Sequence, residues 1–198
     1  MKSIKNSVVN EIVIEKSRFI TYLFNSTTTK DSMDRISEIK RLHPDSTHIV
    51  YGLLNSKDER SNDNGEPKGT AGIPTIEVLR KNNLTNIIAI TVRYFGGIKL
   101  GAGGLVRAYT KGVTEALKKA EFSELQAVLN VELILTYKDS SFLDKVFDYY
   151  LNIDKNYQDK VQYNIQILKS KIDSFKKLFL NFKDEYSFNI ISEVEVFI

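Results

Sequence analysis

One stretch of the 198-residue chain concentrates residue types that bind negatively charged groups. Residues 93–107 read RYFGGIKLGAGGLVR and hold five of the chain's ten glycines, with cations at Arg93, Lys99 and Arg107. An apolar run, residues 87–92, precedes the stretch, and apolar residues recur at helical spacing directly after its last glycine. The pattern predicts a strand, a glycine loop and a helix. The free amides and the dipole at such a helix start favour an anion.

The glycines also have a purely structural interpretation, in which they form a tight, well-packed turn from strand to helix. The stretch matches neither G-x-x-x-x-G-K-[ST] nor G-x-G-x-x-G, so the common nucleotide-binding fingerprints are absent. The residues predicted to form an anion site are Arg93, Gly96, Gly97, Lys99, Gly101, Gly103, Gly104 and Arg107.

Residues 55–72 form a second polar segment and are predicted to be one long loop. Loops of this length in compact domains are often functional or disordered. Its three glycines, with Pro67 inside and Pro74 just beyond, favour a defined path, while a simple solvated excursion is the alternative.

The composition limits the possible chemistry. There is no cysteine, which excludes disulfides and thiolate zinc sites. With only His43 and His48 in the chain, a satisfied, half-buried histidine is favoured over a metal ligand for His48. No metal and no cofactor are expected. The sequence has neither an apolar stretch long enough to span a membrane nor a secretory signal, so we expect a cytoplasmic protein without membrane contact.

Glycine, proline and charge divide the chain into two predicted domains, residues 1–126 and 127–198. All ten glycines and all three prolines lie before residue 113. The first domain has 19 Lys and Arg against 14 Asp and Glu, whereas the second has 9 against 11. The mildly basic first domain permits contact with nucleic acid without requiring it.

Apolar periodicity predicts an α+β fold. In the first domain, Thr29 or Asp31 could cap the first helix, and Pro74 suits the first turn of the second. The last 70 residues show the order strand, helix, strand, strand, helix, strand, which is the ferredoxin-like split βαβ arrangement. The elements expected in the first domain are strands at 8–14, 19–24, 47–54 and 86–94 and helices at 31–43, 73–79 and 103–120.

The sequence resembles the Impact/YigZ family in its bacterial, two-domain form. The family's central motif is an Arg-aromatic-aromatic-Gly-Gly run followed by a glycine-rich helix start, which residues 93–104 match. Other blocks follow the family's order: KSRFI at residues 16–20, His48, and NGEPKGTAGIP at residues 64–74. The family usually reads Asp-Asp-Gly-Glu-Pro where residues 63–67 read Asp-Asn-Gly-Glu-Pro. A role that needs two adjacent carboxylates, such as metal binding, is therefore in question.

The resemblance implies an N-terminal α/β domain with a fold like ribosomal-protein domain 2. It also implies a C-terminal ferredoxin-like domain similar to the last domain of elongation factor G. It implies a non-enzymatic regulator or binding protein of translation that contacts RNA or ribosome phosphates, with a translation factor as a further candidate partner. It favours a binding loop that folds near the glycine loop. The loop candidates are His48, Asp63, Gly65, Glu66 and Lys68.

Two other functions remain open. An enzyme acting on a phosphorylated small molecule or a nucleic acid could use Glu66 and Asp63 as acid and base. The sequence offers no Ser-His-Asp pattern and no carboxylate-histidine cluster at metal-ligand spacing, so no catalytic residue is assigned. The chain could also be a protein-interaction module that binds no nucleic acid, with the ferredoxin-like sheet as its surface.

Overall fold

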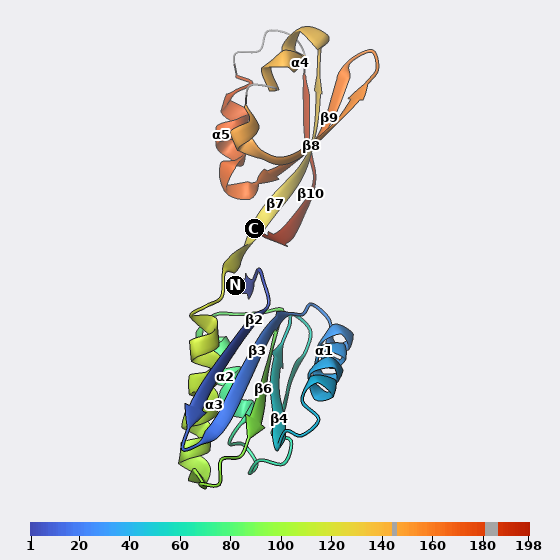
Figure 1. Ribbon diagram of the computed structural model, residues 1–198. Helices are drawn as coiled ribbons and strands as arrows, with labels where there is room; N and C mark the ends of the chain where they lie inside the picture. Colours follow the sequence, from blue (N-terminus) through green and yellow to red (C-terminus); the bar gives the residue numbers. More distant parts are fainter. Residues whose placement is uncertain (144–145, 181–185) are drawn as a thin grey trace. The chain divides into compact units, whose positions relative to one another are not determined.

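The computed structural model of the chain describes residues 1–143, 146–180 and 186–198 (Figure 1). It separates into two compact units, Met1–Ser123 and Glu124–Ile198. Each unit carries helices and an antiparallel sheet, so the chain has the expected α+β class. The division falls within strand β7 (Phe122–Leu135), three residues before the boundary predicted from composition.

The first unit is built on a five-stranded antiparallel sheet in the order β2-β3-β6-β4-β5. Strand β5 lies inside the segment that was predicted to be loop throughout. Its four residues, ERSN, are all exposed, so no apolar alternation marked it, and it forms by pairing with β4. The short strand β1 was also not predicted. The strands of this unit are β1 (Lys2–Ile4), β2 (Val8–Ile14), β3 (Ser17–Asn25), β4 (His48–Leu54), β5 (Glu59–Asn62) and β6 (Ile87–Tyr94).

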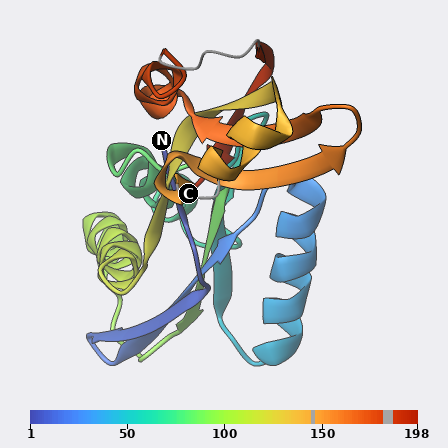
Figure 2. The ribbon, with the colours of Figure 1, turned by 90° about the horizontal axis from the view of Figure 1, so that it is seen from above.

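Helices cover both faces of this sheet, with α1 on one side and α2 and α3 on the other (Figures 1 and 2). Side chains alternate between the faces of a strand. Ile88 and Ile90 of β6 therefore pack toward α1, while Ile87 and Ala89 pack toward α2 and α3. Covering on both sides explains why the β6 sequence is apolar up to Arg93 except for Thr91, whose buried hydroxyl is hydrogen-bonded to Thr21.

The three helices of this unit are α1 (Thr29–Leu42), α2 (Gly72–Lys81) and α3 (Gly101–Leu117). Helix α1 is capped by Thr28, whose Oγ1 accepts a 3.1 Å bond from the Asp31 amide, rather than by Thr29 or Asp31 as predicted. Helix α3 begins two residues before its predicted start. No helix within the described ranges has the length and apolarity needed to cross a membrane.

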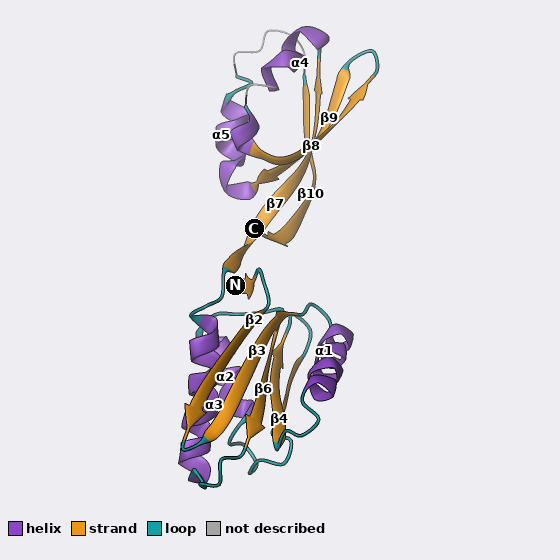
Figure 3. Ribbon diagram, in the orientation of Figure 1, coloured by secondary structure: helices purple, strands orange, loops and turns teal. Residues whose placement is uncertain are grey.

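The second unit places four antiparallel strands in the order β10-β7-β9-β8, with α4 and α5 on the same side of them (Figure 3). A buried cluster that includes Leu133, Tyr163, Ile165 and Phe175 fills the space beneath the helices. The elements follow the order expected for this part of the sequence. They are β7, α4 (Tyr137–Leu143), β8 (Tyr150–Tyr157), β9 (Val161–Leu168), α5 (Ile172–Lys177) and β10 (Ser187–Phe197).

Gly96, just after β6, lies against the turn that joins β2 to β3. Glu15 and Lys16 in this turn have φ of 46° and 62°, the left-handed backbone of a two-residue hairpin turn. A Cβ atom added to Gly96 would overlap the backbone of Lys16 and Ser17. The close approach of two backbones therefore requires glycine here.

We expect Gly96→Ala to lower the free energy of unfolding by about 1–3 kcal/mol, because the methyl group must push the β2–β3 turn away. Chemical denaturation measures the change. Gly103→Ala is the matched control, since a Cβ at Gly103 meets only Arg107 Nη1 at 3.6 Å and alanine favours a helix. Equal stability of the parent and the Gly96→Ala protein would contradict the packing seen here.

Candidate functional site

Strand register brings three side chains of different strands to one place. Arg93 of β6 is paired with Phe19 of β3 on one side and with His48 of β4 on the other. Directly opposite residues share a face of the sheet, and this face lies toward α3. The site therefore starts from Arg93, flanked by an aromatic ring and an imidazole.

Arg93 is buried in an internal ion pair. Its side chain is only 6% exposed, and its Nη1 donates to Glu66 Oε1 at 2.7 Å. The Tyr109 hydroxyl of α3 donates to the same oxygen, also at 2.7 Å. The guanidinium lies over the rings of Phe19 and Phe95, at 5.3 and 5.6 Å from their centroids. The prediction that Arg93 presents an exposed cation to an anion is therefore wrong, because Glu66 already neutralises it.

Burial, reinforced by the negative charge of Glu66, raises the pKa of Tyr109 well above its ordinary value. The phenol therefore stays protonated and acts as a permanent donor to Glu66. In the sequence, Tyr109 occupies one of the positions at which apolar residues recur along α3. The signal that could have singled it out is its hydroxyl, since a buried tyrosine hydroxyl needs a hydrogen-bond partner.

Asp63 organises the loop between β5 and α2. Its carboxylate accepts three backbone N–H bonds, from Gly69 at 2.7 Å, Ala71 at 3.0 Å and Gly72 at 2.8 Å. Burial alone would raise the pKa of Asp63, but the three amides outweigh it and hold the pKa below its usual range. Asp63 is therefore committed to holding the loop, which leaves it poorly suited to the acid or base role considered from sequence.

The next residues explain how the loop tolerates Asn64. Asn64 and Gly65 both have positive φ, 44° and 85°, and the turn closes with a 3.0 Å bond from the Glu66 amide to the Asp63 carbonyl. Asparagine is among the residues that adopt this conformation most readily. The Asn64 carbonyl, rather than its side chain, contacts the site by accepting a bond from His48. Within the described residues, no group of three or more His, Asp or Glu side chains is placed to hold a metal ion.

His48 is half-buried, and its two ring nitrogens have different neighbours. Nδ1 lies 2.8 Å from the Asn64 carbonyl oxygen, which can only accept, so Nδ1 carries a proton. Nε2 lies 3.9 Å from Glu66 Oε2. In the neutral ring Nε2 is therefore an acceptor that lies near a second acceptor.

A hollow of about 400 Å³, the Glu66 hollow, opens beside these groups. Its lining includes the first residue of β4 and the first residues of α3, and it combines charged, aromatic and aliphatic side chains. The residues that line it are Thr47, His48, Gly65, Glu66, Pro67, Arg93, Phe95, Lys99, Leu100, Gly101, Ala102 and Leu105.

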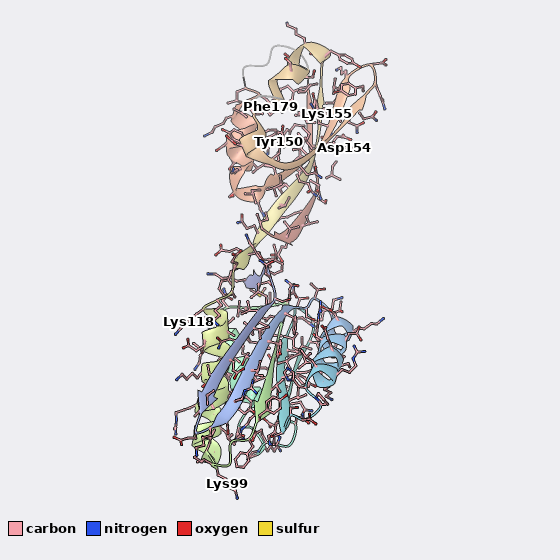
Figure 4. All side chains as sticks on the ribbon, viewed as in Figure 1. Lys99, Lys118, Tyr150, Asp154, Lys155 and Phe179 are labelled. Atoms are coloured by element: carbon pink, nitrogen blue, oxygen red, sulfur yellow. The ribbon has the colours of Figure 1, made fainter. Side chains whose placement is uncertain are left out.

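A second hollow of about 510 Å³, the basic hollow, lies along the other side of the α3 start. Lys99, Arg107 and Lys111 provide its positive charge, and Glu15 is the acidic residue among those that line it. All three cations are exposed, and Figure 4 shows Lys99 pointing away from the ribbon near the α3 start. The other lining residues are Ile14, Ile98, Leu100, Gly104 and Ala108.

The predicted site residues fall into three groups. His48, Gly65, Glu66, Arg93, Lys99 and Gly101 come together in the Glu66 hollow. Lys99, Gly104 and Arg107 line the basic hollow. The predicted residues that line neither hollow are Gly96, Gly97, Gly103, Asp63 and Lys68.

The structure adds residues that were not among the predicted site residues. Ser17 Oγ is fully buried and accepts a 3.1 Å bond from the Gly96 amide, which fixes the start of the glycine loop. Phe95 and Lys111 line the two hollows. Ser17 and Phe95 lie in motif blocks, whereas Lys111 lies four residues after Arg107 in α3.

Comparison with known proteins identifies the class of proteins to which this chain belongs. Residues 15–117 match the model of the Impact N-terminal domain, a span that includes the loop held by Asp63, the whole lining of the Glu66 hollow and the lining of the basic hollow except Ile14. The chain belongs to the Impact family, as the motif blocks indicated. The family member YvyE of Bacillus subtilis is 36% identical over 183 residues, covering 88% of this chain and 83% of YvyE.

Other relatives match over a shorter span. The family member YigZ of Escherichia coli is 40% identical over 118 residues, which is 57% of each chain. Among solved structures, the crystal structure of a hypothetical protein aligns with a TM-score of 0.61 and 28% identity, covering 96% of this chain and 97% of the other. That likeness extends over both units, although its description gives no function.

We expect Asp63→Ala to lower the free energy of unfolding by about 2–4 kcal/mol, because three buried amides lose a charged acceptor. Chemical denaturation measures this. The folded-state pKa of Asp63 is lowered, so the contribution is present at neutral pH and is lost as the pH falls through the acidic range. Asp45→Ala, at an exposed carboxylate, is the control and should leave stability nearly unchanged. A loss no larger than that of the control would refute the role given to Asp63.

Proposed function

We propose that this chain is a non-enzymatic, cytoplasmic protein associated with translation, and that it contacts RNA or ribosome phosphates through the basic hollow. Membership of the Impact family supports the association with translation. The geometry supports the chemistry, since phosphate contacts need exposed cations and free amides rather than a catalytic constellation.

The observation that carries the proposal is the charge at the start of α3. Lys99, Arg107 and Lys111 line one hollow, and none of them forms an ion pair with any residue that the structure describes. Arg107 Nη1 lies 3.6 Å from the position of a Cβ on Gly103, so its guanidinium folds back over the first turn of α3. A cation at a helix N-terminus opposes the dipole, and an anion placed between them relieves the conflict.

The helix start adds its own donors. Leu100 at the N-cap provides no side-chain hydrogen bond, so the first amides of α3 lack a side-chain acceptor. Gly101, Ala102 and Gly103 are all exposed, which lets a phosphate approach the backbone closely. Contacts of this kind fix the position of RNA without reading its sequence.

We also propose the finer fold names. The strands lie in the order β10-β7-β9-β8, helix α4 connects β7 to β8, and helix α5 connects β9 to β10. This arrangement supports a ferredoxin-like second unit similar to the last domain of elongation factor G. The helix-covered sheet of the first unit supports an Impact-type fold like ribosomal-protein domain 2. An RNA, a ribosome or a translation factor is then the expected partner.

The two alternatives receive less support. The enzyme hypothesis needs Asp63 and Glu66 free for proton transfer, yet Asp63 accepts three amides and one oxygen of Glu66 accepts two donors. A module that binds only protein leaves the cations of the basic hollow without a function. Both alternatives become outcomes of the experiment below.

The test is RNA affinity as a function of salt for the parent and for Arg107→Ala with Lys111→Ala. We expect affinity to fall steeply with salt, and the slope of log K against log salt to become shallower by about 1.4 in the double variant, from about 0.7 for each lost phosphate contact. The matched control is Lys118→Ala with Lys119→Ala at the other end of α3 (Figure 4).

A flat salt response, or equal slopes in the two double variants, would refute the proposal. Co-sedimentation with ribosomes at low and high salt extends the test to the assembled partner. Saturable turnover that Glu66→Gln abolishes in a folded chain would favour the enzyme hypothesis instead.

A further inference from the structure

Glu66 lines the Glu66 hollow, and one of its two carboxylate oxygens accepts no hydrogen bond from the described residues. The Glu66 side chain is only 3% exposed, and Arg93 and Tyr109 both bond to its Oε1. Its Oε2 accepts no hydrogen bond from the described part of the chain, and His48 Nε2 lies 3.9 Å from it. A carboxylate oxygen beside a hollow with no internal donor can accept a hydrogen bond from a ligand.

His48 further restricts which hydrogen-bonding groups a ligand of this hollow can present. Its Nδ1–H donates to the Asn64 carbonyl, so Nε2 of the neutral ring is also an acceptor. Two acceptors 3.9 Å apart can be served by one group with two N–H bonds. A primary amino group on the ligand meets this requirement, whereas a carbonyl oxygen at the same place would repel both.

Another part of the lining of the hollow favours negative charge. Gly101 and Ala102, the first residues of α3, line it together with Lys99. Helix α3 is 17 residues long and has no side-chain cap. Its first amides and its dipole suit a phosphate. Glu66, with its unbonded oxygen, is independent of this helix start and lines the same hollow.

The lining of the hollow also includes an apolar surface. Phe95 is 46% exposed and lines the hollow with Leu100 and Leu105. The Arg93 guanidinium lies over the Phe95 ring at 5.6 Å, which helps to hold the ring in place. An aromatic ring supported in this way is suited to stack with a flat, conjugated ligand.

We propose that the Glu66 hollow holds a single nucleotide of RNA whose base bears an exocyclic amino group. The base stacks on Phe95, the amino group donates to Glu66 Oε2 and His48 Nε2, and the phosphate meets Lys99 and the α3 amides. The volume of about 400 Å³ falls in the range of small-molecule sites. This inference rests on the proposed function and extends it, because the basic hollow only positions the backbone while the Glu66 hollow distinguishes bases.

The first test compares mononucleotides that differ in the amino group, by NMR titration at millimolar concentrations. CMP should bind about tenfold or more tightly than UMP, and AMP similarly more tightly than IMP, because uracil and hypoxanthine offer no amino group to the two acceptors. Equal affinity within each pair, or no binding by any of the four, overturns the inference.

The second test removes the aromatic wall. Phe95→Ala should weaken CMP binding about tenfold, since stacking on an aromatic side chain contributes much of the affinity for a base. Ile98→Ala is the matched control, because Ile98 is a similarly exposed residue of the same loop (40%) that lines only the basic hollow. Equal losses in the two variants overturn the stacking arrangement.

A third variant, Glu66→Gln, exchanges an acceptor-only group for an amide that can also donate, and should reduce the preference for CMP over UMP. Thermal unfolding checks that the chain still folds, because Arg93 loses its charged partner. If it does not fold, the comparisons of bases and of Phe95→Ala decide the matter. Preferential binding of a free amino acid or dipeptide over every nucleotide also overturns the inference.

These experiments distinguish failure of the base-reading site from failure of the proposed contact with RNA. If long RNA binds with the expected salt response while the nucleotide pairs show no discrimination, the basic hollow keeps its role and the base-reading site fails. If the nucleotides discriminate but long RNA does not bind, the proposed function fails and a site for small nucleotides remains.

Discussion

The buried ion pair between Arg93 and Glu66 is the interaction on which the first unit's site depends. It joins the central strand β6 to the loop ahead of α2, and the Tyr109 hydroxyl ties α3 to the same oxygen. A charge that is removed from water must find its partner, so neither the strand nor the loop can occupy this position alone. The same pairing leaves the second oxygen of Glu66 without an internal hydrogen bond, and our proposal gives that oxygen a role in recognition.

Two hollows of different character lie at the α3 start. Lys99 lines both of them, so in our proposal a phosphate at Lys99 would connect the two. In the basic hollow the cations are exposed, so they favour negative charge without selecting a ligand of defined shape. In the Glu66 hollow, acceptors, an aromatic ring and helix amides lie at fixed places on a covered sheet. This division matches the general rule that backbone contacts set position and base contacts set identity.

Sequence patterns predicted the main elements and named many of the residues that line the two hollows, but not how the charges pair. The apolar run before Arg93 and the glycines after it marked β6 and the α3 start, because both follow from local periodicity. The motif around Glu66 indicated a loop near the glycine turn. The burial and ion pairing of Arg93 depend on the register of β6 and on Glu66, a partner 27 residues away. Neither can be read from the periodicity of apolar residues. Asp63 illustrates the same limit, since its role arises from amides that a folded loop brings together.

Gly96 and the β2–β3 turn are almost 80 residues apart in the sequence, yet their backbones touch. The β2–β3 hairpin therefore connects two strands and also fixes the position at which the glycine loop begins. An insertion in that turn, which most surface hairpins accept without consequence, would here displace the start of the loop that carries Phe95 and Lys99. The evolutionary freedom of one exposed turn is thus limited by the geometry of a site on another segment.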